Sequence, residues 1–163
     1  MPSIDAATFR ELMGRFATGV TVITAADGDR YHGMTANAVT SLSLDPLLLL
    51  VCVDKTTHAH GMLSRSGRFA VNILAADQER ISRLFAQKGE PEAGSLRGER
   101  FHIAASGAPI LSDALAYLDC RVARSYEGGD HTIFVGEVTG GATLRDAPPL
   151  IFYRGGYRTL GEP

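Results

Sequence analysis

The sequence has little of what marks a secreted, membrane or nucleic-acid-binding protein. It has only two cysteines, Cys52 and Cys120, and both lie inside apolar stretches, which argues against a disulfide framework and favours two core residues. The formal net charge is only -2, so no general attraction to nucleic acid or to an anionic membrane is expected. The longest apolar run, Leu47 to Val53, is too short to span a bilayer. Met1 to Thr8 lacks the basic start and apolar run of a secretion signal, so we expect a cytoplasmic protein that acts on small molecules.

Two common nucleotide-binding motifs are also missing. The Gly-rich dinucleotide fingerprint between a strand and a helix is absent, and so is the Gly-rich loop ending in Lys and Ser or Thr that holds phosphates. A nucleotide that binds this chain must therefore be held by other means.

The composition is that of an ordinary globular domain. Hydrophobic residues make up 45% and charged residues 21% of 163 residues, and the sequence has no internal repeat, low-complexity segment or linker. We therefore expect one domain over residues 1–163.

Short strands dominate the expected secondary structure. Phe9, Leu12, Met13 and Phe16 recur at helical spacing behind Asp5, which predicts one short amphipathic helix. Beyond this helix, β-rich segments lie on both sides of two turn signals and predict two hairpins. These hairpins are expected at 20–35, around the turn at 27–29, and at 116–139, around the turn at 127–130.

Two apolar runs predict central strands. Leu47 to Val53 is apolar on both faces and is expected to be covered on both sides, and Phe69 to Leu74 repeats the pattern with one Asn inside it. Short helices are expected at Thr57 to Ser66 and at Asp77 to Lys88, each stopped by a glycine, and a last strand at Leu150 to Tyr153. The long segment from Gly89 to Gly107 has no clear period, and we interpret it as a lid. Many short strands with few helices favour a closed antiparallel barrel.

The most distinctive stretch runs from Gly33 to Pro46, where small and hydroxylated residues alternate before the most apolar strand. Small side chains let a flat ligand approach the backbone, although a strand with one exposed polar face would show the same pattern. Together with other segments, this stretch resembles the short-chain flavin reductase family, the reductase components of two-component flavin-dependent monooxygenases. The other matching segments are 16–23, 67–74 and 129–138.

The resemblance implies a mostly β fold with short helices, the FMN-binding split β-barrel of antiparallel Greek-key type. It implies a homodimer with FMN or FAD near the subunit interface, reduced by hydride from NADH or NADPH. It further implies that the reduced flavin passes to a separate monooxygenase.

The resemblance also assigns site residues. Met34, Thr35, Ala36 and Asn37 would follow the isoalloxazine edge, Ser41 would reach the ribityl or phosphate portion, and Cys52 and Val53 would line the ring through backbone atoms. Lys55, Thr56 and Thr57 would hold a phosphate, although a solvated loop is the alternative. His131, within Gly129-Asp130-His131, would meet the nicotinamide, unless it only completes a turn. Phe85, Tyr153 and Tyr157 complete the flavin-binding candidates, and both tyrosines fit a structural cap equally well.

Competing interpretations remain for some residues. His58 and His60 have the spacing of a metal pair, but no third ligand is evident nearby, so no metal is expected. A hydrolase using Ser41 or Cys52 with His58 is disfavoured because a thiol inside an apolar run lacks the electropositive setting of a reactive one. A flavin-binding redox sensor or storage protein without reductase turnover is the main alternative to the enzyme.

Overall fold

The computed structural model describes residues 3–161. In chain order its elements are α1 (Ala6–Met13), β1 (Thr18–Gly19), β2 (Thr21–Asp27), β3 (Arg30–Ala36), β4 (Val39–Leu44), β5 (Leu47–Asp54), α2 (His58–Ser66), β6 (Arg68–Ile73), η1 (Ala76–Gln78), α3 (Glu79–Ala86), β7 (Glu92–Ala93), β8 (Phe101–Ile103), β9 (Pro109–Leu111), β10 (Ala116–Gly128), β11 (His131–Thr143), β12 (Ile151–Tyr153) and β13 (Gly156–Arg158). The prediction of a mostly β fold with short helices is confirmed.

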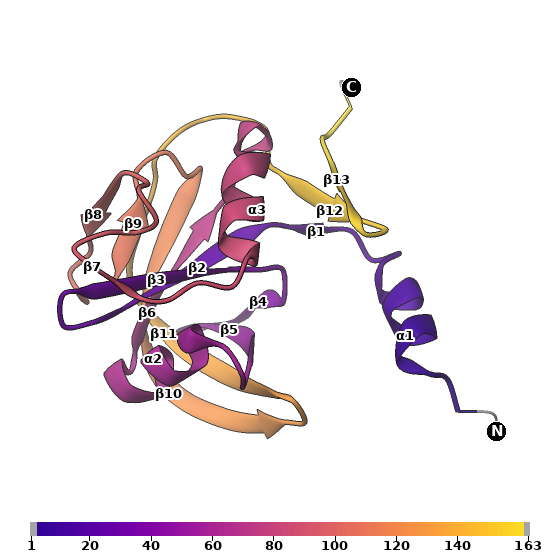
Figure 1. Cartoon of the computed structure of the whole chain (residues 1–163), viewed down its shortest axis with the longest axis horizontal. Helices are drawn as coiled ribbons and strands as arrows, with labels where there is room; N and C mark the ends of the chain where they lie inside the picture. Colours follow the sequence, from indigo (N-terminus) through magenta and orange to yellow (C-terminus); the bar gives the residue numbers. More distant parts are fainter. Residues whose placement is uncertain (1–2, 162–163) are drawn as a thin grey trace.

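One large antiparallel sheet organises the fold (Figure 1). Its 8 strands follow the order β4-β5-β11-β10-β6-β2-β3-β7, beside a 3-stranded sheet of β1, β12 and β13 and a 2-stranded sheet of β8 and β9. Within residues 3–161 the edge strands of the large sheet are β4 and β7. These two strands are not hydrogen-bonded to each other, so the eight strands do not form a closed ring. The sheet's edge at β4 and β5 is the part that positions the candidate site.

Local sequence signals account for the elements that were predicted well. The Asp5 carboxylate accepts a hydrogen bond from the backbone N–H of Thr8 at 2.8 Å and caps α1. Helix α2 ends at Gly67, whose φ of 65° is a left-handed conformation that favours glycine. The hairpins β2–β3 and β10–β11 form around the expected turns. The helix expected over 77–88 is shorter, because its first turn is the 3₁₀ helix η1 and α3 ends at Ala86.

The core lies on both faces of β2. Ile23 and Ala25 belong to a cluster with residues of α2, and Val20 and Val22 belong to a second cluster with residues of α3. Successive residues of a strand point to opposite faces, so the two helices cover opposite sides of this part of the sheet. Strand β2 is thereby packed on both sides.

The single Asn inside the apolar strand β6 is a fully satisfied core residue. Asn72 is fully buried, and its Nδ2 donates to the Val22 carbonyl and to Thr24 Oγ1, both at 3.0 Å. Its Oδ1 accepts from the backbone N–H of Leu111 at 2.9 Å. Because buried polar groups are costly when unpaired, this amide joins β6, β2 and β9 in one fixed arrangement.

The expectation that β5 is covered on both faces is wrong for the single chain. Leu49, Val51 and Val53 are buried, but the alternate residues Leu48, Leu50 and Cys52 face an open groove. Cys52 is therefore half-buried and only in part the core residue that was expected, whereas Cys120 is buried. Burial raises the pKa of the Cys120 thiol to about 12, so this thiol is protonated and unreactive.

The segment between α3 and β9 is anchored, although it carries no periodic pattern. Leu96 is buried in the cluster under α3. The Arg97 guanidinium donates to the backbone carbonyls of Leu84, Gln87 and Lys88. These contacts tie the part of this segment that we interpreted as a lid to the end of α3.

Within residues 3–161, no helix combines the length and the apolar character that a membrane span requires.

Candidate functional site

Strand β5 brings the predicted flavin-binding residues together, because it pairs with β4 on one side and with β11 on the other. Cys52 donates its backbone N–H to the carbonyl of Ala38 at 3.0 Å and is the register partner of Ile133. Two residues further along β5, Asp54 is the register partner of His131. The segment after β3, the end of β5 and the start of β11 therefore form one continuous surface.

The loop after β5 is folded around one carboxylate. Asp54 Oδ1 accepts hydrogen bonds from the backbone N–H and the hydroxyl of Thr56, both at 2.7 Å. The Asp54 carbonyl accepts from the Thr57 hydroxyl at 2.8 Å, and Thr57 Oγ1 in turn caps α2 by accepting from the His60 N–H at 3.2 Å. The bonds from Thr56 to the carboxylate lower the pKa of Asp54, so it is ionised at neutral pH. The predicted phosphate loop is thus a compact turn at the start of a helix.

Lys55 links this loop to the β10–β11 turn. Its backbone N–H donates to the Asp130 carbonyl at 3.0 Å, and its ammonium group forms an ion pair with the Glu127 carboxylate. That ion pair lowers the pKa of Glu127, so the carboxylate is charged at neutral pH. The basic group expected to meet a phosphate is therefore paired with an acidic side chain of the protein itself.

His131 is the first residue of β11 and lies beside this loop. Its Nδ1 contacts Asp130 Oδ1 at 2.7 Å, and its side chain is 42% exposed. This contact engages Nδ1 and leaves the Nε2 edge as the one that a ligand would meet. The histidine is therefore oriented and accessible, as a residue that positions a substrate must be.

A second set of candidates meets at α3. The Thr35 hydroxyl donates to the Ser82 carbonyl at 2.6 Å, and the Ser82 hydroxyl shares a hydrogen bond of 2.7 Å with the Tyr157 hydroxyl. The Arg83 guanidinium lies 4.9 Å from the centroid of the Tyr157 ring. One face of the Tyr157 ring is thus covered by a cation, and its hydroxyl is engaged with α3.

The remaining candidates differ in accessibility. Phe85 is only 2% exposed and lies against Gly33, where an added Cβ would come within 2.7 Å of the Phe85 ring. Val53 is fully buried, so only its backbone can face a ligand, as the resemblance implied. Met34 and Tyr153 are half-buried, whereas Ser41 is exposed and lines the groove described below. The role of each of these five residues stays a prediction.

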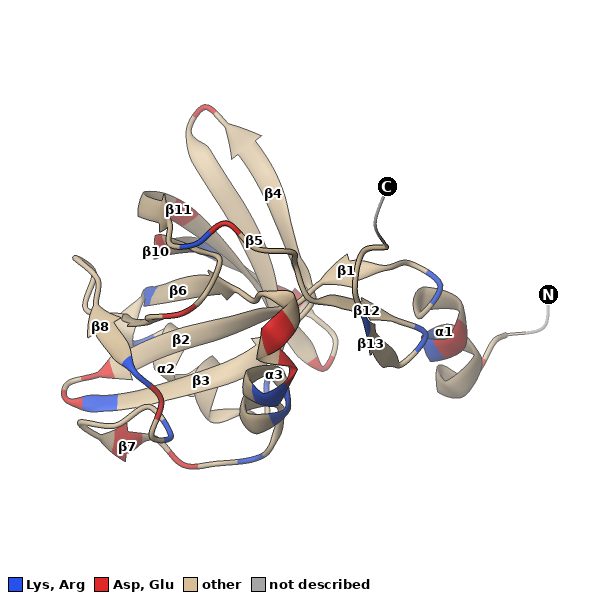
Figure 2. Cartoon of the chain, turned by 90° about the horizontal axis from the view of Figure 1, so that it is seen from above, with Lys and Arg blue, Asp and Glu red and all other residues tan. Residues whose placement is uncertain are grey.

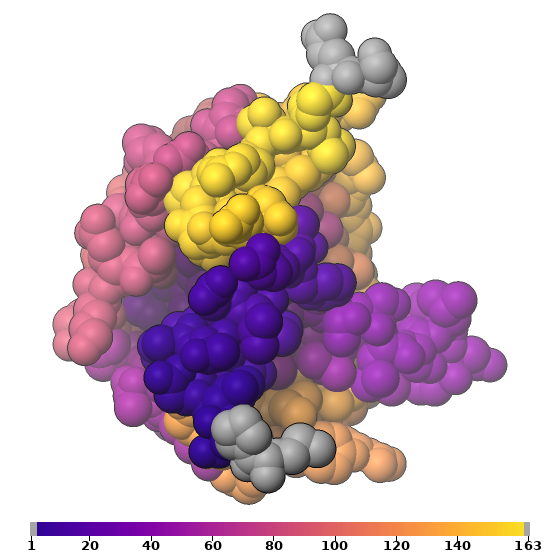
Figure 3. Space-filling view, turned by 90° about the vertical axis from the view of Figure 1, so that its right-hand side faces the viewer, coloured from indigo at the N-terminus to yellow at the C-terminus, as the bar shows by residue number. Residues whose placement is uncertain are grey.

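A large groove runs beside the site, between α1 and the β4–β5 hairpin, with a volume of about 1190 Å³. Figure 3 shows this hairpin, in purple, projecting from the body of the molecule, and Figure 2 shows β4 and most of β5 without charged residues. Asn37, Ala38 and Cys52 line one end of the groove, next to the surface described above. Its other walls are mostly apolar and include Phe9, Met13, Phe16, Leu44 and Leu47, with polar residues such as Arg10 and Ser41 among them. Leu44 is 83% exposed, which is unusual for a large apolar side chain.

The two histidines near the loop point to different partners. His58 Nε2 lies 3.2 Å from Glu90 Oε2, and its ring packs against His32. His60 Nε2 lies 2.8 Å from Thr132 Oγ1 on β11. Across the described part of the chain, no group of three or more potential metal ligands comes together. Their arrangement gives no support to a metal pair.

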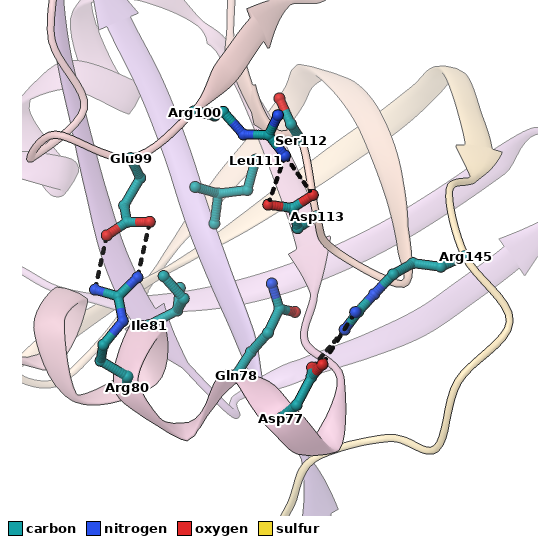
Figure 4. Close-up of a pocket in the computed structure, with 10 residues that line it drawn as sticks. All are labelled: Asp77, Gln78, Arg80, Ile81, Glu99, Arg100, Leu111, Ser112, Asp113 and Arg145. Carbon is teal, nitrogen blue, oxygen red and sulfur yellow. Dashed lines mark hydrogen bonds and ion pairs between the residues drawn. The ribbon is translucent and has the colours of Figure 1, made fainter.

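A smaller cavity of about 230 Å³ lies elsewhere, between α3 and the segments around 99–100 and 111–113 (Figure 4). Its three arginines are each paired with a carboxylate in the pairs Arg80–Glu99, Arg100–Asp113 and Arg145–Asp77. Its lining includes none of the predicted site residues. The candidate site is therefore the surface at β5.

Sequence reasoning missed the acidic residues of this surface. Asp54 follows the apolar strand directly, and Glu127 belongs to a turn motif that was recognised only as a turn. Only the pairing of β5 with β11 brings Glu127 to Lys55, so no local pattern reveals their contact. The link from Thr35 through Ser82 to Tyr157 is likewise formed by segments far apart in the sequence.

Comparison with known proteins identifies the family. The family model described as "Flavin reductase like domain" matches residues 13–161. An NADH-dependent flavin reductase from Rhodococcus sp is 40% identical over 98% of this chain and 89% of that protein. HsaB, the reductase subunit of a flavin-dependent monooxygenase from Mycobacterium tuberculosis, is 39% identical over 98% of this chain and 84% of that protein.

A solved structure agrees with these relatives. The NADH:FAD oxidoreductase SgcE6 of Streptomyces globisporus C-1027, in complex with NAD and FAD fragments, superposes with a TM-score of 0.89 at 37% identity, covering 99% of this chain and 98% of that chain. The chain belongs to the flavin reductase like domain family. The recognition made from the four sequence motifs is confirmed.

Proposed function

We propose that this chain is an NAD(P)H-dependent flavin reductase that transfers hydride from NADH or NADPH to FMN or FAD. Its relatives at about 40% identity include an NADH-dependent flavin reductase and an NADH-dependent FAD reductase. The observation that carries the proposal is the pairing of β5 with both β4 and β11. Through this pairing the segment around Ala38 and the start of β11 at His131 share one surface, which supports the proposal that flavin and nicotinamide meet there.

The residues of this surface fit a flavin nucleotide. Small side chains at Ala36 and Ala38 leave the backbone accessible to a flat ring, and Asn37 adds a polar group at the end of the groove. Lys55 supplies a cation near the start of α2, which suits a phosphate that takes the place of Glu127. When bound, the flavin supplies the atom that accepts hydride.

The protein itself contributes mainly alignment. Hydride transfer needs little acid or base help, so the absence of a catalytic triad from the predicted site is no obstacle. We assign His131 the role of receiving the nicotinamide, because its ring is held by Asp130 and exposed beside the end of β5. The backbone of Thr35 to Asn37 and of Cys52 and Val53 would hold the flavin ring.

Steady-state assays test the enzyme against its main alternative. Purified protein is mixed with NADH or NADPH and with FMN, FAD or no added flavin, and nicotinamide oxidation is followed. We expect oxidation that depends on both protein and flavin. Flavin binding without nicotinamide oxidation would instead identify a redox sensor or storage protein.

We also propose that residues 1–163 form one domain that works as a homodimer. A second copy of the chain is the occupant that fits the apolar groove, because the exposed face of β5 and the exposed side chains of α1 would otherwise remain in water. We expect the protein to supply reduced flavin to a separate monooxygenase, because its relative HsaB is named as the reductase subunit of a flavin-dependent monooxygenase. We propose a cytoplasmic location, as the sequence analysis expects.

Light scattering tests the dimer. The wild-type protein should have the mass of two chains at micromolar concentration. Leu44→Asp places a charge in the exposed apolar wall of the groove and should shift the mass toward one chain. A monomeric wild type that retains full activity would contradict this proposal.

A further inference from the structure

We propose that Glu127 competes with the flavin phosphate for Lys55 and thereby weakens the binding of phosphorylated flavins. This inference rests on the proposed function. Glu127 would be a residue that sets flavin affinity, and it would distinguish flavins that carry a phosphate from those that do not. Neither the family resemblance nor the turn motif assigned it such a role.

The donors expected to meet a phosphate are occupied within the protein. The Lys55 ammonium group pairs with Glu127, and both donors of Thr56 are bound to the Asp54 carboxylate. The Thr57 hydroxyl donates to the Asp54 carbonyl. Two carboxylates of the chain thus occupy the positions where a phosphate would find its partners.

The two carboxylates differ in how easily they can be displaced. Asp54 accepts two hydrogen bonds from Thr56 within the turn, so moving its carboxylate would cost the loop both bonds. Glu127 reaches Lys55 from the β10–β11 hairpin, and its side chain is 80% exposed. An exposed ion pair contributes little net stability, so exchanging this carboxylate for a phosphate costs the fold little.

The backbone contact of Lys55 keeps the loop in place during that exchange. The Lys55 N–H remains bound to the Asp130 carbonyl when only its side chain moves. The Glu127 carboxylate is charged at neutral pH, so it both occupies the ammonium group and repels an incoming phosphate. A phosphorylated flavin must overcome both effects, whereas riboflavin, which has no phosphate, meets neither.

This arrangement suits a protein that hands reduced flavin to another enzyme. A phosphate held by a lysine that has its own counter-ion is released more easily than one held by an unpaired lysine. Glu127 would therefore favour turnover of flavin as a substrate over its retention as a fixed group.

The test compares FMN and riboflavin binding to wild type and Glu127→Gln by flavin fluorescence titration. At low salt the variant should bind FMN about 3- to 10-fold more tightly, and the gain should shrink as salt screens the charges. Riboflavin affinity should change by less than about 2-fold. Asp113→Asn, which removes one carboxylate from an exposed ion pair in the smaller cavity, is the charge-matched control and should leave both affinities unchanged.

Lys55→Met provides a second arm of the test. In that background the gain in FMN affinity from Glu127→Gln should be smaller than in the wild-type background, because the competition for Lys55 is gone and only the repulsion between Glu127 and the phosphate remains. Unchanged FMN affinity in Glu127→Gln, or equal gains for FMN and riboflavin, would overturn the inference while leaving the reductase proposal intact. A wild type that binds neither flavin and oxidises no NADH would refute the proposed function, and this inference with it.

Discussion

Replacing His131 with Ala should slow flavin reduction while sparing both flavin binding and the fold. The side chain is 42% exposed, and its only hydrogen bond within the described residues is to Asp130, the residue before it. Because this is a surface contact, its loss should lower the free energy of unfolding by less than about 1 kcal/mol. If Nε2 positions the nicotinamide, the loss of one such hydrogen bond should slow reduction about 10- to 100-fold, or roughly 1.4 to 2.7 kcal/mol.

Anaerobic stopped-flow reduction by NADH is the assay, run beside a flavin titration and a melting curve. His102→Ala, which alters an exposed histidine on the distant strand β8, is the matched control and should match wild type in all three measurements. A wild-type reduction rate in His131→Ala would remove this histidine from the site. Parallel losses of stability, flavin affinity and rate would show a purely structural role.

Three further substitutions test the site and the fold. Asn37→Leu should weaken flavin binding about tenfold in a fluorescence titration, because a polar partner is lost and volume is added where the flavin ring approaches. Unchanged flavin affinity would show that this segment is an ordinary strand. Asn72→Leu leaves the buried Leu111 N–H unpaired and removes the amide's bonds to the Val22 carbonyl and to Thr24. It should cost about 2 to 4 kcal/mol in denaturant unfolding, and a loss below about 1 kcal/mol would contradict this hydrogen bonding. Burial lowers the pKa of His32 from 6.5 to about 4. Between these two pH values the unfolded chain binds a proton at His32 and the folded chain does not, so the free energy of unfolding falls as the pH drops from 6.5 to about 4. His32 should lower the free energy of unfolding by about 2 to 3 kcal/mol over this pH range. Denaturant unfolding at several pH values should show this contribution in wild type and not in His32→Gln.

The parts of the fold that were predicted from the sequence are those with local causes. Asp5 caps α1, Gly67 ends α2 in a left-handed conformation, and the turn at 27–29 joins two β-rich segments. Each signal acts within a few residues, so a single sequence contains all the information that it needs.

The parts that were mispredicted depend on distant contacts. The apolar run in β5 indicated cover on both faces, but in one chain only Leu49, Val51 and Val53 are covered. The segment after α3 was interpreted as a lid because it has no period, yet Leu96 and Arg97 anchor it. A single buried leucine and one arginine that binds three carbonyls leave no repeating pattern to recognise.

The residues of the candidate site also fall into two groups, those that a local motif reveals and those that only distant contacts bring together. Its small and hydroxylated residues between β3 and β5 form a motif, and the resemblance that they carry led to the family. The groups that set its electrostatics, Glu127 above all, reach it only through the pairing of β5 with β11. The motif therefore does not reveal which carboxylate pairs with the lysine of the predicted phosphate loop, because the fold alone brings the two together.

The most direct test of the reductase assignment is anaerobic mixing of the protein and an oxidised flavin with NADH or NADPH. Loss of the visible absorbance of the oxidised flavin reports its reduction. We expect fast bleaching that saturates with nicotinamide concentration, for FMN or FAD, at a rate far above that of free flavin mixed with the same nucleotide. Bleaching no faster than in the protein-free control, with both nucleotides and both flavins, would contradict it.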